Sequence, residues 1–275
     1  NSDKVSGYIG ECRECGIALL PPDINRSADR FTVEEGGIRF GLVAIKNIGR
    51  GFIQAVMRER ETGGDFTSLY DFCSRMNGSE MNKRAVENLI RSGAFDSMGA
   101  RRSQLIKVYE SVMDSVAAQQ RENVEGQMDF FSMAADNDEK SNSVKEIPLP
   151  DIPEYTPEEL MTMEKATTGL YLSGHPMDHY RDAVRKLHAP TIVSIIEDFS
   201  RENGPERFTD GQRITIAGVI TSSKTKTTKN NSLMAYVMVE DDTASMELLC
   251  FSRVLETCGA YMKENQAVVV KGRLS

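Results

Sequence analysis

Two glycines and two cations stand close together in one short segment of the sequence: Lys46, Gly49, Arg50 and Gly51. Glycine reaches backbone angles that side chains forbid and lets a phosphate approach closely. A helix that starts here would add unpaired N–H groups and the positive end of its dipole. The spacing indicates a turn that holds a polyanion by its backbone and not by its base sequence. An ordinary tight turn in a helical bundle fits the same spacing.

A weaker version of this pattern follows Gly99, where Arg101 and Arg102 open the next expected helix. The first segment resembles a helix-hairpin-helix, and we interpret this one as a second, degenerate hairpin. Both arginines are therefore candidate contacts to the backbone of a polyanion.

A lysine-rich segment of the C-terminal part, which we expect to be a loop between strands, could contact a single nucleic-acid strand. Lys224, Lys226 and Lys229 would follow its phosphates, with Tyr236 and Phe251 as stacking platforms for bases. A solvated surface loop is the alternative interpretation.

A short apolar peptide interrupts an otherwise polar and acidic stretch. Its residues are Gln127, Met128, Asp129, Phe130 and Phe131. A glutamine followed by adjacent aromatics is typical of a linear docking peptide, in which the rings fill a partner's pocket. The alternative is that the two rings pack onto the protein's own helices.

The local charge of the 275-residue chain matters more here than its formal net charge of −8. Residues 38–110 hold 12 basic and 8 acidic side chains, and residues 213–275 hold 8 and 6, whereas residues 111–165 hold 4 and 13. Local sign decides where a polyanion docks. Two weakly basic blocks therefore flank an acidic connector.

Periodicity gives the elements that must position these residues. Residues 10–20 are expected to form a short helix and residues 31–40 a hairpin around Gly36-Gly37. Residues 41–115 have helical spacing, with Ser68 and Asn82 at expected helix starts. From Arg213 the period is two, in the order strand, strand, strand, helix, strand, which is typical of an oligonucleotide-binding (OB) barrel that lacks its fifth strand.

The predicted fold class is α+β with several domains. The expected divisions are a tail of a larger unit over 1–40, a helix-hairpin-helix domain over 41–115, an acidic linker over 116–160, a helical connector over 161–212 and a truncated OB domain over 213–275.

Several functional classes find little support in the sequence. No apolar run approaches the ~20 residues of a membrane span, and the N-terminus has no signal-peptide core. Five cysteines form no disulfide framework, and Cys12 and Cys15 lack the further ligands that zinc needs. A cytoplasmic protein with reduced thiols is expected.

Several separated motifs resemble one family, the alpha subunit of bacterial DNA polymerase III. They are Leu19-Leu20-Pro21-Pro22-Asp23-Ile24-Asn25, Ile38-Arg39-Phe40-Gly41-Leu42 through Gly51, Ser92-Gly93-Ala94-Phe95-Asp96 and Gly169-Leu170-Tyr171-Leu172-Ser173-Gly174-His175-Pro176. The order of hairpins, linker and barrel is similar too.

The resemblance implies that the hairpin domain grips duplex DNA and that the barrel binds the single-stranded template. It also implies that the peptide Gln127–Phe131 docks on the β sliding clamp, beside other holoenzyme subunits. The catalytic carboxylates and Mg²⁺ of the family belong to an upstream palm domain, so a fragment without cofactor or activity of its own is expected. No membrane partner is implied.

Other functional classes fit parts of the pattern. A stand-alone, non-enzymatic DNA-binding adaptor could combine the same modules. A bacterial NAD-dependent ligase places its barrel before the hairpins and carries a four-cysteine zinc site, and neither feature is in this sequence. A zinc or thiol protein would have to be built on Cys12 and Cys15.

Overall fold

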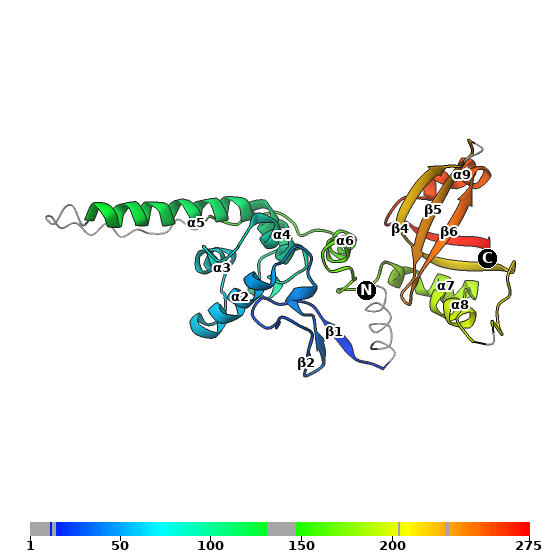
Figure 1. The fold of residues 1–275 in the computed structure, drawn as a ribbon, viewed down its shortest axis with the longest axis horizontal. Helices are drawn as coiled ribbons and strands as arrows, with labels where there is room; N and C mark the ends of the chain where they lie inside the picture. Colours follow the sequence, from blue (N-terminus) through cyan, green and yellow to red (C-terminus); the bar gives the residue numbers. More distant parts are fainter. Residues whose placement is uncertain (1–11, 13–14, 131–146, 203, 229–230) are drawn as a thin grey trace. The chain divides into compact units, whose positions relative to one another are not determined.

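The protein was analysed as a computed structural model that describes residues 12, 15–130, 147–202, 204–228 and 231–275, with the backbone alone over 122–130. The chain divides into two compact units (Figure 1). The helical unit comprises Ile17–Ser173, and the sheet unit comprises Gly174–Ser275 together with Asn1–Gly16. The boundaries between the units fall inside two of the expected divisions, 1–40 and 161–212.

A small sheet lies at the start of the helical unit. Its strands are β1 (Ala18–Leu20), β2 (Thr32–Glu34) and β3 (Gly37–Arg39), in the order β1-β3-β2. The hairpin prediction is confirmed, because β2 and β3 pair antiparallel. The predicted helix over 10–20 is wrong at its end, since β1 pairs parallel with β3.

The helices of this unit follow the apolar spacing of the sequence. They are the 3-10 turn η1 (Leu42–Ala44), α2 (Arg50–Gly63), α3 (Leu69–Met76), α4 (Lys83–Arg91), the 3-10 turn η2 (Asp96–Met98), α5 (Arg102–Phe130) and α6 (Pro157–Thr168). The predicted starts are confirmed: Ser68 accepts from the Asp71 amide and Asn82 from the Ala85 amide.

Four phenylalanine rings occupy the centre of the helical unit. Phe72 is the common partner: its ring lies edge-on to those of Phe52, Phe66 and Phe95, with centroids 5.0–6.2 Å apart. All four are at most 2% exposed. Buried rings in this geometry add to the hydrophobic stabilisation, so the core fixes α2, α3 and the turn after α4.

Helix α5 crosses the boundary that composition places at residue 115. It continues to Phe130, and Figure 1 shows its C-terminal part extending past the other helices of this unit. The chain then returns beside its first turns, where Pro150 accepts from the Gln104 amide group at 2.8 Å. Part of the expected linker is therefore helix, and part lies along that helix.

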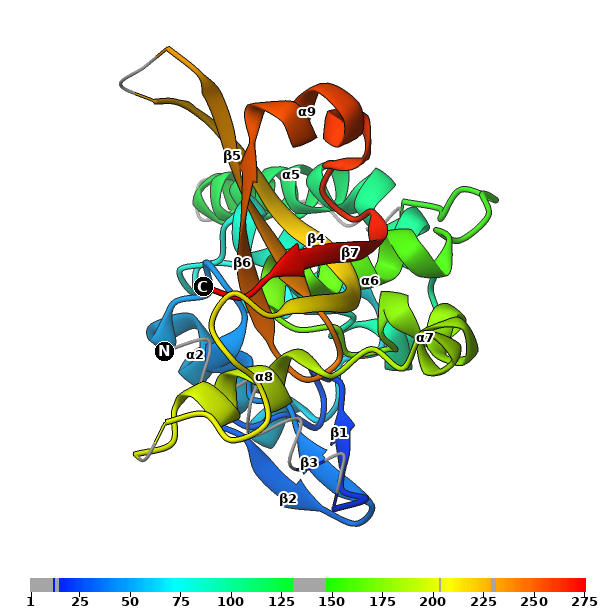
Figure 2. The same cartoon turned by 90° about the vertical axis from the view of Figure 1, so that its right-hand side faces the viewer.

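The sheet unit is a half-barrel of four strands within its described residues. They are β4 (Arg213–Thr227), β5 (Leu233–Glu240), β6 (Ser245–Phe251) and β7 (Ala267–Arg273), all antiparallel, in the order β6-β5-β4-β7. Helices α8 (Ile192–Phe199) and α9 (Ser252–Cys258) lie at opposite ends of the sheet (Figure 2). The 3-10 turn η3 (Pro176–Tyr180) and α7 (Arg181–Leu187) precede α8.

Strand β4 bends where it changes partner. Its first half pairs with β7 and its second half with β5, and Val219 pairs with both. A Cβ atom on Gly218 would lie 2.6 Å from the carbonyl oxygen of Glu240, so only glycine fits this close approach. The bend gives the sheet an inner face, which packs against α8 through Ile192, and an outer face.

Candidate nucleic-acid interface

The first predicted site lies where α2 begins, and the geometry of its glycines differs from expectation. Neither glycine uses a positive φ, because Gly49 is extended (φ −73°) and Gly51 is helical. Asn47 adopts the left-handed conformation instead, with φ 62°. The element before the turn is the single 3-10 turn η1 and not a full helix. Gly49, Arg50 and Gly51 are exposed at the start of α2.

Lys46 is tied to the end of another helix. Its Nζ donates to the carbonyl of Ala166 at 2.8 Å, and its backbone amide donates to the carbonyl of Thr167 at 2.9 Å. A cation at the C-terminal end of a helix is favourable. The lysine is exposed, so a phosphate would compete with Ala166 for its ammonium group.

An acidic side chain lies beside this helix start. The Glu80 carboxylate, from the segment between α3 and α4, lies 2.8 Å from the position of a Cβ atom on Gly51 and 4.0 Å from that on Gly49. Anions are stabilised at helix N-termini. The position predicted for a phosphate is thus next to a carboxylate of the same chain, which the sequence analysis did not identify.

At the second predicted hairpin, too, a carboxylate of the same chain lies at the start of a helix. Glu154 accepts from the backbone amides of Arg102 and Ser103 at 2.7 and 3.0 Å, at the first turn of α5. Desolvation raises the pKa of Glu154. The hydrogen bonds that its carboxylate accepts from the amides of Tyr155, Ser103 and Arg102 have a larger, opposite effect, so the pKa is lowered overall. An internal carboxylate therefore takes the place of the expected phosphate.

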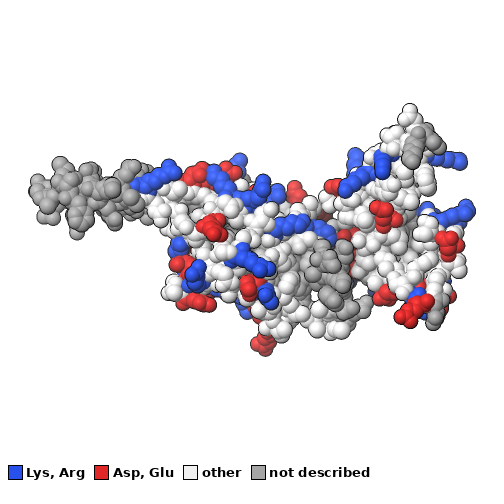
Figure 3. Space-filling view, in the orientation of Figure 1, with Lys and Arg blue, Asp and Glu red and all other residues white. Residues whose placement is uncertain are grey.

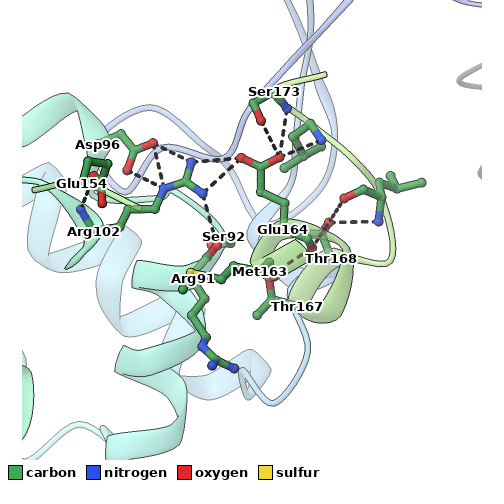
Figure 4. A network of polar contacts seen from close by, with 12 residues as sticks. Arg91, Ser92, Asp96, Arg102, Glu154, Met163, Glu164, Thr167, Thr168 and Ser173 are labelled. Atoms are coloured by element: carbon green, nitrogen blue, oxygen red, sulfur yellow. Dashed lines mark hydrogen bonds and ion pairs between the residues drawn. The ribbon is translucent and has the colours of Figure 1, made fainter. Parts of the chain in front are cut away.

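The predicted duplex contact at Arg102 is wrong. Its side chain is only 6% exposed and forms ion pairs with Asp96 at 2.7 Å and Glu164 at 3.1 Å (Figure 4). The other oxygen of Glu164 accepts from the amides of Leu172 and Ser173. Desolvation opposes the charge of Arg102, but the two carboxylates raise its pKa overall. The residue joins α5 to α6 inside the unit.

Arg101 stays at the surface of the helical unit. It is exposed, and its guanidinium donates to the carbonyl of Ile152 at 2.7 Å. Figure 3 shows further Lys and Arg side chains along α5 and over α4, with acidic side chains between them. The face is mixed in charge. Lys46, Arg50 and Arg101 are the predicted basic contacts that have exposed side chains.

The predicted single-strand site is brought together by strand register. The prediction that Lys224 and Lys226 lie in a loop is wrong, because both belong to β4. Lys224 pairs with Tyr236, which pairs with Leu249, and Lys226 pairs with Met234, which pairs with Phe251. Directly opposite residues share a face of the sheet. Two cross-strand rows, each with one lysine and apolar partners, therefore lie on the outer face.

The exposure of these rows fits a stacking surface. Phe251 is 63% and Leu249 48% exposed, whereas the alternate residues Ala235, Val237 and Val239 are buried on the inner face. The sequence analysis missed Met234 and Leu249. The alternation of threonine and lysine from Lys224 to Thr227 is a period-two signal that could have identified the strand.

Other predicted site residues lie outside what the structure describes. Lys229 and Phe131 are outside the described residues, and Gln127, Met128, Asp129 and Phe130 are described only as backbone at the end of α5. Among the described residues, no group of three or more His, Cys, Asp or Glu side chains could hold a metal ion. No helix of that part is long and apolar enough to cross a membrane.

Comparison with known proteins gives two consistent results. Residues 16–105 match a family model described as a helix-hairpin-helix motif. The whole chain is 31% identical to DNA polymerase III subunit alpha of Vibrio cholerae and 34% identical to that of Saccharopolyspora erythraea, and 93% of it is 36% identical to that of Deinococcus radiodurans. The chain belongs to the DNA polymerase III alpha subunit family. It spans 23%, 22% and 19% of the length of these alpha subunits.

Both units of the chain lie within the stretch that is similar to the alpha subunits. The helix-hairpin-helix match covers the small sheet, α2 to α4 and the start of α5. The half-barrel lies beyond that match and within the stretch shared with the alpha subunits. Both candidate surfaces thus lie in segments that the alpha subunits share.

Proposed function

We propose that this chain is a DNA-gripping region of a replicative DNA polymerase. The outer face of the half-barrel would bind single-stranded template, and the start of α2 would hold the duplex backbone. The observation that carries the proposal is the pair of in-register rows on the outer face. A row of this kind offers an ammonium to a phosphate and an apolar surface to the neighbouring base.

The half-barrel supports the single-strand role through its topology. Three antiparallel strands, a helix and a fourth strand that pairs back with the first follow the order of an OB barrel. We propose an OB domain whose strands β4, β5 and β6 present the binding face. We expect binding to be independent of base sequence, because the lysines contact phosphates and the apolar side chains can stack against any base.

The duplex role rests on the α2 start and on the helix-hairpin-helix match. Arg50 is exposed there, and the first amides of α2 have no partners within their own helix. The resemblance places the Mg²⁺-dependent nucleotidyl transfer of the family in an upstream palm domain. We assign to the residues of this unit the holding of DNA.

We also propose that Gln127–Phe131 docks on the β sliding clamp. The support is the resemblance of the peptide to a docking motif, together with the family membership of the chain. Clamp pull-down by the 275-residue chain tests it, with Gln127→Ala plus Phe131→Ala expected to abolish capture and Asn137→Ala to preserve it. Equal capture by all three proteins would remove this part of the proposal.

Oligothymidylate binding by the 275-residue chain tests the central proposal. We expect Phe251→Ala to weaken binding by about tenfold, because loss of one base-stacking platform costs ~1–3 kcal/mol. Tyr261→Ala is the matched control, since Tyr261 is 66% exposed but lies outside the two rows. Equal affinities for the parent and the Phe251→Ala variant would contradict the proposal.

A further inference from the structure

A second group of cations lies on the outer face, at the far end of β4. Arg213 pairs directly with Arg273, and the next outward pair is Thr215 with Lys271. All three basic side chains are exposed. We call Arg213, Lys271 and Arg273 the β4–β7 patch.

This arrangement carries an electrostatic cost, and no ion pair known from the described residues offsets it. Like charges directly opposite each other on neighbouring strands destabilise a sheet. Among the ion pairs of the described residues, none includes a member of the β4–β7 patch. A bound polyanion would supply the missing negative charge.

The patch lies on the same face as the two proposed binding rows. Outward positions along β4 run from Arg213 through Ala217 and Val219 and, after the bulge between Ile220 and Ser222, to Lys224. At ~3.3 Å per residue, Arg213 and Lys224 are separated by at most about 36 Å of strand. Between the groups, Ala217 and Val219 are buried against Met177 of η3 and Val184 of α7. A single nucleic-acid strand would therefore pass over η3 and α7 to meet both groups.

The part of the face between the two groups holds a cavity of about 620 Å³ with Ala217 in its lining. Arg185 and Arg207 contribute to its walls. Two of its acidic residues are engaged within the protein, since Asp178 pairs with Arg181 and Asp241 accepts from the Ile192 amide. Asp242 is the remaining carboxylate there. The route between the groups thus offers further cations to a phosphate chain.

We infer that the β4–β7 patch is a second phosphate-binding subsite, which holds the backbone of the same single strand beyond the Lys224 and Lys226 rows. The inference rests on the proposed function of the outer face. It predicts a binding site longer than the two rows alone, and it assigns a role to three residues that the motif analysis did not single out.

Oligonucleotides of two lengths separate the two subsites. The probes are labelled oligothymidylates of about 6 and about 18 nucleotides, chosen around the ~4–16 nucleotides that one OB domain covers. The 275-residue chain is compared with the triple variant Arg213→Gln/Lys271→Gln/Arg273→Gln. Arg253→Gln is the matched control, because Arg253 is exposed on α9 and lies outside both groups.

We expect the triple variant to bind the longer probe at least tenfold more weakly and to bind the shorter probe as the parent does. The log–log salt slope for the longer probe should become flatter by about 2, at ~0.7 for each lost phosphate contact with a single strand. Arg213→Lys/Arg273→Lys should retain most of the affinity. Unchanged binding of the shorter probe by the triple variant excludes misfolding as the cause of the loss.

The outcomes distinguish the inference from the function on which it rests. If the triple variant matches Arg253→Gln on the longer probe, the second subsite is overturned while the rows keep their role. If Lys224→Gln/Lys226→Gln leaves the affinity for both probes unchanged, the proposed function of the outer face fails, and the second subsite fails with it.

Discussion

The Oε2 atom of Glu80 lies 2.8 Å from the position that a Cβ atom would take on Gly51. The absence of a side chain at Gly51 is what lets this carboxylate approach the first turn of α2. A bound phosphate would need the same space and the same N–H groups. Glu80 and a DNA phosphate would therefore compete for the start of α2.

Neutralising Glu80 should strengthen duplex binding. We expect Glu80→Gln to raise the affinity for a short duplex by about fivefold, because a unit charge about 4 Å from a phosphate costs ~1 kcal/mol in water. Fluorescence anisotropy at low salt measures the change. Glu61→Gln is the control, since Glu61 is exposed near the other end of α2. An unchanged or lower affinity for Glu80→Gln would argue against competition at this site.

The buried pair of Arg102 and Glu164 should behave as a unit in unfolding. We expect Glu164→Leu to lower the free energy of unfolding by about 3 kcal/mol, because it leaves a buried guanidinium with only Asp96 as a charged partner. The double variant Arg102→Leu/Glu164→Leu should lose much less unfolding free energy than the sum of the losses of the two single variants. Urea unfolding followed by circular dichroism measures both.

Asp96→Ala provides the comparison for this pair. The Asp96 side chain is 48% exposed, so its loss should cost ~1 kcal/mol or less. Additive effects of Arg102→Leu and Glu164→Leu would show that the pair is not coupled.

Local features of the fold could be predicted from the sequence. Ser68 and Asn82 begin helices because their side-chain oxygens accept from amides three residues later, which is a short-range effect. The hairpin over 31–40 has the same local origin. The first turn of α5 is different, because Glu154 reaches it from about fifty residues away and no nearby residue signals that contact.

In the candidate site, too, the residue types could be predicted from the sequence, whereas their alignment and burial depend on distant segments of the chain. The residue types at Lys224, Tyr236 and Phe251 indicated a single-strand surface, but only the pairing of β4, β5 and β6 aligns them in rows. Arg102 was misassigned because a basic residue after a glycine looks the same whether it faces solvent or a buried glutamate. Burial depends on α6, which lies far along the chain.

The carboxylate of Glu154 should make the stability of the helical unit depend on pH. Its pKa is lowered in the folded protein from a reference value of 4.5. Its contribution is therefore complete above about pH 4.5 and is lost as the pH falls through the lower, folded value. We expect Glu154→Gln to cost about 1 kcal/mol at neutral pH, as for loss of a helix cap.

Thermal unfolding at two pH values tests this dependence. The difference between the parent and Glu154→Gln should shrink as the pH is lowered below 4.5, where the parent's Glu154 also becomes neutral. Glu159→Gln is a control, since Glu159 is exposed and caps α6 instead. A difference that is constant across this pH range would contradict a role for the charge of Glu154.

Asp241 should stabilise the inner side of the proposed single-strand surface. Thr191, at the start of α8, makes no capping contact with its own side chain, and Asp241 accepts from the Ile192 amide at 2.7 Å instead. Ile192 is fully buried against Ile220 and Val237, beneath the outer face. The turn between β5 and β6 therefore holds α8 against the sheet.

Removal of this cap should loosen α8 while leaving the outer-face side chains in place. We expect Asp241→Ala to lower the free energy of unfolding by about 1–2 kcal/mol, in the range for lost helix caps, and to speed hydrogen exchange of the α8 amides. Asp242→Ala changes the neighbouring carboxylate, which makes no hydrogen bond to α8 among the described contacts. If only Asp241→Ala has these effects, their cause is the set of hydrogen bonds that Asp241 accepts from Ile192 and from Thr243 and Ala244 of its own turn. Equal effects of the two substitutions would instead point to the charge of the turn.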